Sequence, residues 1–362
     1  MEDLARGGAG VARDPEGRAV FIPLTLPGDR VRVRVLKQEK RYAHAELERV
    51  ITPSPQRQAP RCAVFGKCGG CDWQHVPYEM QWATKVRGIG EALARAGVTP
   101  PGKCQEFAAE APWSYRNRIQ LRGRGDQVGY HARGSHQLVP ITACDIAQPA
   151  LLAQLPAIRE RGRSLGRDYK VEIEALPDGS SRVVWDAPHG AAGFRQVNDA
   201  QNLRLRAWVT SAVRGSGVVF DLYGGDGNLT RDIASRVDHV EVVDLGAPRV
   251  DPPAKPAGLR YFRAAVVPWI QARAGQGADE KAASVIVDPP REGLGKDLPT
   301  LLASLARLGV TEAVVVGCDP DAWARDLKGW TTAGWRMTEF AALDFFPQTH
   351  HVEAVARLER AC

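Results

Sequence analysis

The C-terminal half of the chain repeats one hydrophobic pattern, a short apolar run that stops at turn or acidic residues. Such runs occupy positions 218–220, 240–243, 285–287 and 314–316. Runs of this length that are rich in Val are typical of parallel strands buried on both faces. Apolar positions with helical spacing occur near 202–213 and 300–308. We predict a doubly wound α/β domain over residues 191–362.

The first 53 residues follow a different pattern, in which apolar and polar residues alternate. Residues 19–23 and 30–35 form two such runs, and Leu-Pro-Gly-Asp at 26–29 marks a turn between them. In the second run, valines alternate with arginines. A basic strand face is either merely solvated or follows a phosphate backbone. We predict a small β-barrel with a basic face over residues 1–53.

The segment between these regions, residues 54–190, is predicted to be a β-rich domain that also contains one helix. Apolar residues at helical spacing predict that helix over 78–97, with Gly97 as its stop. The C-terminal domain is a candidate packing partner for it. Residues 113–124 alternate and interleave arginines with aromatics, which predicts a strand. Arginine forks bind phosphates and aromatic faces stack on RNA bases, although a solvated basic strand is the alternative. The predicted RNA-binding residues are Arg116, Arg118 and Arg122.

Charge and composition exclude several classes of protein. The formal net charge of +6 suits a polyanionic partner such as RNA. No apolar run approaches the roughly 20 residues that cross a membrane, and the N-terminal Met-Glu-Asp is unlike a signal peptide. We expect a cytoplasmic monomer without a membrane segment or an obligate protein partner.

The seven cysteines are an odd number in a chain without a secretion signal, which favours metal binding or catalysis over a disulfide framework. Three of them form the pattern Cys-x5-Cys-Gly-Gly-Cys, and its glycines allow the chain to bend round one metal centre. Four thiolates suit either a structural zinc ion or a [4Fe–4S] cluster, and spacing alone does not separate the two. The predicted ligands are Cys62, Cys68, Cys71 and Cys144; Cys104 and Cys362 match no pattern.

The ends of two predicted strands suit a nucleoside-like cofactor. Asp221 is followed by Tyr-Gly-Gly-Asp-Gly at 223–227, a turn that lets the backbone approach a ligand, and we expect a helix to start near 229. The turn lacks the lysine of a Walker loop and is a poor dinucleotide fingerprint, so S-adenosylmethionine fits it better. We assign Asp221 and Gly225 to this cofactor, with Asp244 in the position that binds ribose hydroxyls. Two ordinary α/β strands are the alternative.

Three further residues lie at strand ends and suit covalent chemistry on a pyrimidine. Asp288 and Cys318 each follow an apolar run, and Glu353 lies at the start of a final strand over 352–358. Uracil C5 is a poor nucleophile, but a thiolate that adds to C6 places electron density on C5, and a base must then remove the C5 proton. Cys318 is the candidate nucleophile and Glu353 the candidate base. The alternative is a buried structural cysteine.

These motifs together resemble the RNA 5-methyluridine methyltransferase family. The resemblance lies in Asp-Pro-Pro-Arg at 288–291, Cys-Asp-Pro at 318–320 with Ala-Arg-Asp-Leu at 324–327, and Phe-Pro-Gln-Thr-x-His-Val-Glu at 346–353. Gly-Ala-Gly-Val-Ala at 8–12 and the turn at 26–29 resemble a TRAM RNA-binding domain. The cysteine pattern is similar to that of the family's iron–sulfur branch, typified by enzymes that modify 23S ribosomal RNA.

The resemblance implies a Rossmann-like class I methyltransferase domain, an OB-like TRAM barrel and a central iron–sulfur domain. It implies a [4Fe–4S] cluster rather than zinc, and S-adenosylmethionine as methyl donor. It makes Cys318 the nucleophile and Glu353 the proton-abstracting base. Beside the donor or the reacting base it places Gln196, Tyr223, Asp244 and Asp288.

Three alternative functions stay open. A tRNA 5-methyluridine methyltransferase differs from the favoured reading only in its substrate. An RNA-binding protein with an inactive methylase domain would not need both Cys318 and Glu353. The third alternative is a zinc-containing methylase of base amines, because the Asp-Pro-Pro motif at 288–290 resembles the motif of such enzymes. In those enzymes an aromatic residue usually follows the prolines, whereas Arg291 stands there in this chain.

The chain departs from the family pattern at four places. Gly224 stands where the family usually has cysteine, Gly317 where it has serine, and Asp319 where it has asparagine. The strand that ends at Asp244 runs into the proline-rich segment 247–258, where proline prevents the usual helix. These differences affect the expected geometry of the site but leave the thiol, the base and the glycine turn in place.

Overall fold

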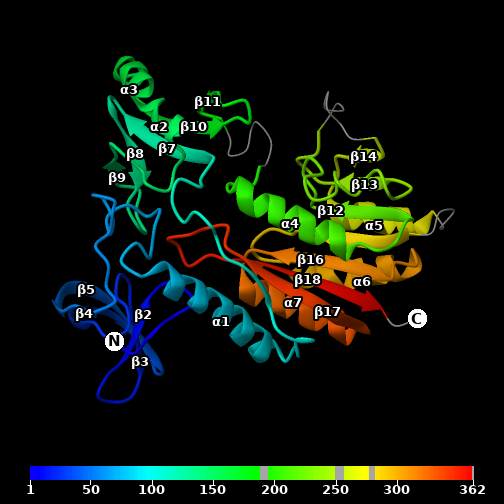
Figure 1. Ribbon diagram of the computed structural model, residues 1–362, viewed down its shortest axis with the longest axis horizontal. Coiled ribbons are helices and arrows are strands. Elements are labelled where there is room, and N and C mark those ends of the chain that lie inside the picture. The colour runs from blue at the N-terminus through cyan, green and yellow to red at the C-terminus, as the bar shows by residue number, and fades with distance from the viewer. Residues whose placement is uncertain (188–194, 249–256, 277–281, 361–362) are drawn as a thin grey trace.

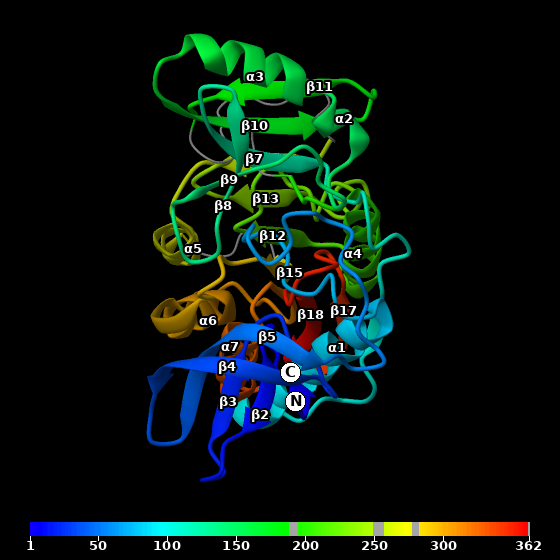
Figure 2. The ribbon, with the colours of Figure 1, turned by 90° about the vertical axis from the view of Figure 1, so that its left-hand side faces the viewer.

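Three β-sheets organise the part of the chain that the computed structural model describes, residues 1–187, 195–248, 257–276 and 282–360 (Figure 1). The middle and N-terminal sheets both lie at the left of Figure 1, the middle sheet above and the N-terminal sheet below, and they lie at the top and bottom of Figure 2; the C-terminal sheet forms the rest of the molecule. The expected boundary at 190–191 and most of the proline-rich segment 247–258 fall outside the described residues.

The C-terminal sheet has eight strands in the order β14-β13-β12-β15-β16-β18-β17-β6. The strands from β14 to β16 pair in parallel, whereas β18 is antiparallel to both of its neighbours. The strand bounds are β6 Gln105–Phe107, β12 Val218–Leu222, β13 Val240–Val243, β14 Leu259–Phe262, β15 Ala282–Val287, β16 Glu312–Gly317, β17 Trp335–Leu343 and β18 Glu353–Arg360.

Helices cover both faces of this sheet, as the apolar runs predict. Alternate residues of each central strand point to opposite faces, so that Val315 joins one apolar cluster and Val314 the other. Side chains of four helices complete the first cluster and those of α4 complete the second. The helices are α1 Tyr78–Ala96, α5 Val266–Gly275, α6 Leu298–Arg307 and α7 Pro320–Thr332 on one face, and α4 Asp199–Ala212 on the other.

The helix expected near 202–213 begins three residues earlier, at Asp199, because Asn198 caps it by accepting a hydrogen bond from the Gln201 N–H. The helix expected near 229 does not form, and this prediction was wrong. Residues 226–235 make a series of hydrogen-bonded turns instead. Gly225 and Gly227 both have positive φ, and the Thr230 hydroxyl is bound to Asp221, so the chain cannot enter a regular helix directly after β12.

Helix α1 packs against α7 of the C-terminal sheet, although the two are far apart in sequence. Ile89 and Leu93 lie in the apolar cluster of that sheet, and Gly97 ends the helix in the left-handed conformation, as predicted. On the same helix, Lys85 forms an ion pair with Asp344 in which both side chains are fully buried. Strand β6 also joins the C-terminal sheet, so two elements of segment 54–190 belong to the C-terminal layer.

The middle sheet has the order β11-β10-β7-β8-β9, and α2 Pro149–Leu152 and α3 Leu155–Ser164 pack on it. The strand expected over 113–124 begins only at Arg118. Arg118 is 3% exposed and its guanidinium lies 3.9 Å from the Glu172 carboxylate, so its predicted exposure was wrong. Strand β10 lies beside β7 in the same sheet and places Glu172 and Glu174 next to Arg118. The strands are β7 Arg118–Arg124, β8 Gln127–His131, β9 Leu138–Pro140, β10 Asp168–Ala175 and β11 Ser181–Trp185.

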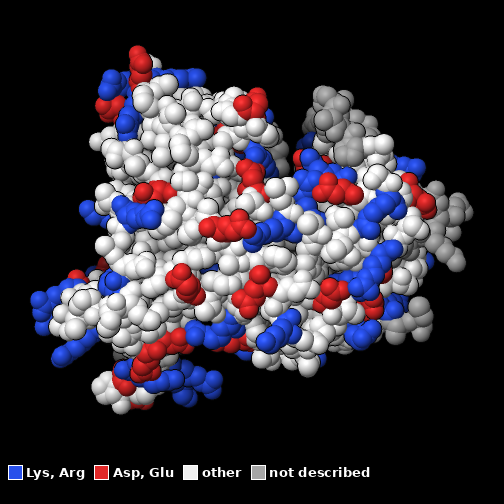
Figure 3. All heavy atoms as spheres, viewed as in Figure 1, with Lys and Arg blue, Asp and Glu red and all other residues white. Residues whose placement is uncertain are grey.

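The N-terminal sheet has the order β1-β2-β3-β5-β4 and is open, so the pairing of its described strands does not give the predicted closed barrel. Strands β4 and β5 form a long hairpin that extends from the end of the molecule, where Lys and Arg side chains gather (Figures 1 and 3). Val35 and Leu36 are 54% and 61% exposed, because the outer part of the hairpin has no second layer. The strands are β1 Asp3–Leu4, β2 Gly10–Arg13, β3 Ala19–Ile22, β4 Arg30–Gln38 and β5 Tyr42–Thr52.

Candidate active site

The predicted site residues lie at one edge of the C-terminal sheet, at the carboxyl ends of its parallel strands. The strand order reverses between β12 and β15, and ligands of open α/β sheets bind at such a point. Asp221 lies in β12, and the Asp288 N–H, just after β15, donates to the Leu222 carbonyl at 3.2 Å. Asp244 directly follows β13 and Cys318 directly follows β16.

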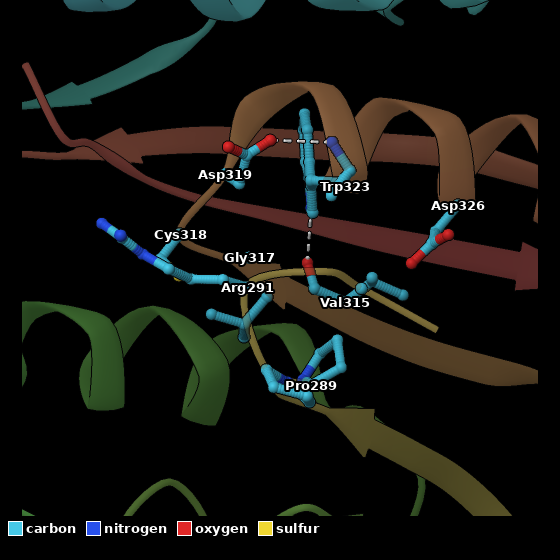
Figure 4. A pocket seen from close by; sticks show the side chains of 12 residues that line it. Pro289, Arg291, Val315, Gly317, Cys318, Asp319, Trp323 and Asp326 are labelled. Atoms are coloured by element: carbon cyan, nitrogen blue, oxygen red, sulfur yellow. Dashed lines mark hydrogen bonds between the residues drawn. The ribbon is translucent and has the colours of Figure 1, made fainter. Parts of the chain in front are cut away.

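Cys318 and Glu353 are neighbours across the antiparallel pair β16–β18. Gly317 is opposite Ala354 in the register, so the next residues on the two strands are Cys318 and Glu353. Opposite residues of antiparallel strands have Cα atoms about 5 Å apart. Glu353 is 3% exposed, whereas Cys318 is half-buried and lines a small pocket with Pro289, Arg291 and Trp323 (Figure 4). The thiol therefore has access to a ligand, and the carboxyl group is sheltered beside it.

Burial dominates the electrostatics of this edge. It raises the pKa of the Cys318 thiol to about 11; the Glu353 carboxylate adds to the rise, and the Arg291 guanidinium opposes it. Burial and Asp288 raise the pKa of Glu353 well above its ordinary value. Desolvation, together with the nearby Asp221 and Asp244 carboxyl groups, raises the pKa of the half-buried Asp288 to about 7. The free protein therefore holds Cys318 as a thiol at neutral pH, and Arg291 is the cation that favours its thiolate.

Replacing Arg291 with methionine is expected to raise the pKa of Cys318, because the substitution removes the positive charge that stabilises the thiolate. Alkylation by iodoacetamide needs the thiolate, so its rate at a fixed pH should fall roughly tenfold for each unit by which the pKa rises. Mass spectrometry of the Cys318 peptide over a pH series measures this rate, and the Cys104 peptide is the internal control. An unchanged pH profile at Cys318 would show that Arg291 does not act on the thiol.

Two departures from the family pattern have a local physical reason. A Cβ atom on Gly317 would lie 2.8 Å from the Trp323 ring, whose Nε1 donates to the Val315 carbonyl at 3.0 Å. The Asp319 carboxylate caps α7 by accepting hydrogen bonds from the Asp321 and Ala322 N–H groups, at 3.0 and 2.9 Å. Glycine at 317 thus makes room for the tryptophan, and aspartate at 319 fixes the helix start beside the thiol.

Gly317→Ser, the residue more usual in the family, is expected to destabilise this protein by about 1–3 kcal/mol through overpacking against Trp323. Chemical denaturation measures the change in the free energy of unfolding. The matched control is Gly90→Ser, because Gly90 is exposed on α1 and has open space around it. Equal stability of the two variants would mean that Trp323 moves aside without cost.

The donor side of the site centres on Asp221, which is fully buried. Its Oδ2 accepts a hydrogen bond from the Thr230 hydroxyl at 2.5 Å, and its Oδ1 has no hydrogen-bond partner among the described residues. Burial raises its pKa to about 7. Asp244 accepts from the Gly225 N–H at 3.3 Å and thereby closes the glycine turn. Carboxyl groups from three strands and one unpartnered oxygen suit a ligand that carries positive charge and donor groups.

The turn after β12 is tightly constrained. Tyr223 has φ of +64°, an uncommon conformation for a residue with a side chain, and such outliers cluster at functional sites. A Cβ atom on Gly224 would lie 2.5 Å from the Asp221 carboxyl group, so glycine is required for this position of Asp221. Gln196 is buried just before α4, where the neighbouring Asn198 side chain donates to the Phe345 carbonyl at 3.4 Å. Gln196 thus lies near the loop that precedes Glu353, and no hydrogen bond links it to Asp221.

The four predicted cysteine ligands line one cavity, which contains about 450 Å³ of empty space, part of it open to solvent. The Gly70 N–H donates to Cys68 Sγ at 3.4 Å, and the Tyr130 hydroxyl lies 3.8 Å from Cys144 Sγ. Burial raises the pKa of Cys71 to about 12 and also raises those of Cys68 and Cys144. Within the described ranges, no group of three or more His, Cys, Asp or Glu side chains is placed to hold a metal ion. The four thiols border a space and do not converge on a point.

The predicted RNA-binding arginines are not one exposed row. Arg118 is buried, Arg122 is half-buried, and Arg116 lies outside the strand and lines the cysteine cavity. The basic hairpin β4–β5 is the more exposed cationic surface. In the described part of the chain, no helix is long and apolar enough to span a membrane.

Sequence patterns did not identify the contacts that hold the loops around the site in place. Asp326 accepts hydrogen bonds from the Leu294 and Gly295 N–H groups and so closes the turn after Arg291. The Lys85 ammonium donates to Asp344 and to the Phe346 carbonyl, and the Tyr115 hydroxyl donates to the Pro347 carbonyl. These contacts join segments up to 261 residues apart, so no local pattern could reveal them.

An open α/β sheet with a glycine turn, acidic strand ends and an edge thiol defines a methyltransferase fold. The same fold is present in the crystal structure of Pyrococcus abyssi tRNA (uracil-54, C5)-methyltransferase in complex with S-adenosyl-L-homocysteine. The two structures superpose with a TM-score of 0.76 over 99% of each chain, at 21% sequence identity. Residues 1–47 match the TRAM domain model, and residues 277–361 match the tRNA (Uracil-5-)-methyltransferase model.

Curated relatives match nearly the whole chain in sequence. The 23S rRNA (uracil(1939)-C(5))-methyltransferase RlmD of Chromohalobacter salexigens is 33% identical, over 99% of this chain and 88% of that protein. The enzyme of the same name from Klebsiella pneumoniae is 29% identical, over 99% and 95% of the two chains. This chain belongs to the family of RNA (uracil-5-)-methyltransferases that carry a TRAM domain.

Proposed function

We propose that the protein transfers a methyl group from S-adenosylmethionine to C5 of a uridine in RNA, with Cys318 as nucleophile and Glu353 as base. The observation that carries this proposal is the register of β16 and β18, which makes the thiol and the sheltered carboxyl group neighbours at the ligand-binding edge. S-adenosylmethionine, when bound, supplies the methyl group as an electrophile. Its positive charge suits the acidic strand ends at Asp221, Asp244 and Asp288, and Tyr223, Gly225 and Gln196 complete the proposed donor site.

The reaction begins when the Cys318 thiolate forms a bond to uracil C6, and the electron pair of the C5–C6 double bond moves into an enolate. Arg291, beside the thiol, stabilises the thiolate. The electron pair on C5 would then form a bond to the methyl carbon as the bond from that carbon to the sulfonium sulfur breaks, which leaves neutral S-adenosylhomocysteine, and C5 still carries its proton. The Glu353 carboxylate removes that proton, the double bond re-forms, and Cys318 leaves C6 as a thiolate. The target base has to leave its stack to reach the half-buried thiol.

The proposed reaction releases the C5 proton in each turnover, which provides a direct test. RNA that carries tritium at uridine C5 should release tritium to water only when S-adenosylmethionine is present, in a one-to-one ratio with methyl transfer. Methylation without tritium release would place the methyl group on another atom and would refute the proposal.

We propose 23S ribosomal RNA as the substrate. Relatives that span nearly the whole chain are named for that activity. The likeness to a tRNA methyltransferase structure rests on 21% identity and supports the fold alone. Transcripts of 23S rRNA and of tRNA, offered at equal concentration, distinguish the two substrates, and methylation of tRNA alone would favour the alternative.

We propose that Cys62, Cys68, Cys71 and Cys144 hold a [4Fe–4S] cluster. Four thiols that border one cavity suit a group of several atoms better than a single zinc ion. Such a cluster would join residues 62–71 to Cys144 and neutralise buried thiolates. Methyl transfer moves no electrons, so the proposed role is structural.

Protein purified without oxygen is expected to be brown and to contain about four iron atoms per chain. Cys71→Ser should lose the iron and the visible absorbance, because a thiolate ligand is removed. Cys104→Ser is the matched control and should keep both. Colourless protein with one zinc ion per chain would contradict the cluster.

We further propose the division of labour expected from the sequence: RNA binding by residues 1–53, a cluster domain over 54–190 and methyl transfer by 191–362. The TRAM match and the exposed basic hairpin support the first part. Helix α1 and β6 are structural parts of the third, although they lie within the second segment. A monomeric, cytoplasmic protein is proposed, and sedimentation of the purified protein tests the oligomeric state.

A further inference from the structure

The loop between β17 and β18, residues 344–352, determines where Glu353 lies, because it ends directly at that residue. Within it, Gln348 has φ of +67°, which costs free energy for a residue with a side chain. Such a conformation persists only when surrounding contacts hold it. The Gln81 and Gln348 side chains form one such contact, at 3.1 Å, and the Gln348 N–H donates to the Gln81 amide oxygen at 2.9 Å.

A second set of contacts comes from Asp72, the residue after Cys71. The N–H groups of Asp72 and Trp73 both donate to the Gln348 carbonyl, at 2.9 and 3.0 Å. The Asp72 carboxylate accepts from His350 Nδ1 at 2.6 Å through Oδ2 and from Arg133 at 2.6 Å through Oδ1. This carboxylate is buried, and it is not among the described residues that line the cysteine cavity. Its partners are therefore the loop and Arg133, and the cavity is lined by other side chains.

The contacts continue from His350 to the nucleophile. The rings of His350 and His351 have centroids 4.1 Å apart, and His351 Nδ1 lies 2.8 Å from the Arg291 guanidinium. Arg291 lines the same pocket as Cys318, and the two are adjacent in Figure 4. A continuous series of contacts thus joins the cysteine segment to both proposed reacting groups of the protein.

We infer that Asp72 is a positioning residue, which fixes the loop 344–352 through its hydrogen bond with His350 and so sets Glu353 and Arg291 relative to Cys318. The predicted effect on the rate of methyl transfer rests on the proposed function. It assigns to the segment beside the cysteines a specific task in the reaction, namely to hold the base in place. Displacement of a catalytic group by about 1 Å costs up to 100-fold in rate, so the predicted effect is on the chemical step.

The kinetic test uses Asp72→Asn, His350→Ala and the double variant in the complete, iron-loaded protein. Each single variant is expected to lower kcat about 10- to 100-fold while KM for RNA changes less than about twofold. Because the two residues act as one unit, the double variant should be no slower than the slower single variant. Glu91→Gln is the matched control, since Glu91 is exposed on α1 and forms an ion pair with Arg87 of the same helix.

A second measurement does not depend on activity. Hydrogen–deuterium exchange of the RNA-free protein should be faster in residues 346–352 of Asp72→Asn than in wild type, with unchanged exchange in β12 and β13 and unchanged iron content. Unchanged exchange in the loop, or kcat within twofold of wild type, would overturn the inference. Loss of iron together with kcat would also overturn it, because Asp72 would then serve the cysteine site. Wild-type protein that transfers no methyl group would refute the proposed function, and the exchange experiment would still test the contact.

Discussion

Cys318→Ala is expected to abolish methyl transfer, with kcat lowered at least about 10⁴-fold, because Cys318 is the one thiol among the described residues that line the pocket. Binding of S-adenosylmethionine should stay within about twofold of wild type, since the donor site lies on β12, β13 and β15. Single-turnover methylation and equilibrium dialysis measure the two quantities.

The control for Cys318→Ala is Cys104→Ala. Cys104 packs at the border of the C-terminal apolar cluster and lies outside both the cysteine cavity and the thiol pocket. The Cys104→Ala variant should retain full methyl-transfer activity. Turnover by Cys318→Ala at the wild-type rate would rule out covalent catalysis by this residue.

Glu353→Gln is expected to stop the reaction after methyl transfer and to accumulate the covalent protein–RNA species. Glutamine has nearly the shape of the protonated carboxyl group but removes no proton, so C5 is methylated while Cys318 stays bound to C6. We expect turnover to fall about 10²- to 10⁴-fold. Denaturing gel electrophoresis with labelled RNA should show a retarded band that needs both Cys318 and S-adenosylmethionine.

The pH dependence of wild-type turnover follows from the same two groups. Their pKa values are raised, so the reactive thiolate and carboxylate become more abundant as the pH rises, and kcat should increase from neutral to alkaline pH. In Glu353→Gln, formation of the covalent species should still increase with pH, because the thiol titration is retained. A protein–RNA species that formed equally without Cys318 would contradict the assigned order of steps.

The sequence predicted that the candidate site residues of the C-terminal sheet lie at one edge, because they follow from strand ends. Once the apolar runs were recognised as parallel strands, the carboxyl ends of those strands had to meet at one edge, and this places Asp221, Asp244, Asp288 and Cys318 together. The neighbour relation of Cys318 and Glu353 needed the family resemblance as well, because no local pattern tells which strand will lie beside β16. Helix α1 was predicted from its spacing alone.

The failures have physical reasons. An alternating pattern says that two faces differ but not which side chains the neighbouring strand will bring, and β10 places Glu174 opposite Arg118. The glycine turn predicts a helix after β12, but Gly225 and Gly227 have positive φ values that a helix does not allow. The Thr230 hydroxyl also donates to Asp221, which holds the chain close to β12. Asp72 and His350 are 278 residues apart, so their pairing is visible only in three dimensions.

The position of β18 has a consequence for how the protein is made. This strand follows every other strand of its sheet in the chain, yet it lies between β16 and β17 and pairs with both. During synthesis, which proceeds from the N-terminus, β16 and β17 therefore wait with unpaired edges until β18 emerges. Exposed strand edges favour aggregation, so a chain that lacks β18 is expected to aggregate. Glu353 is the first residue of β18, so it reaches its place beside Cys318 only when β18 pairs with β16 and β17.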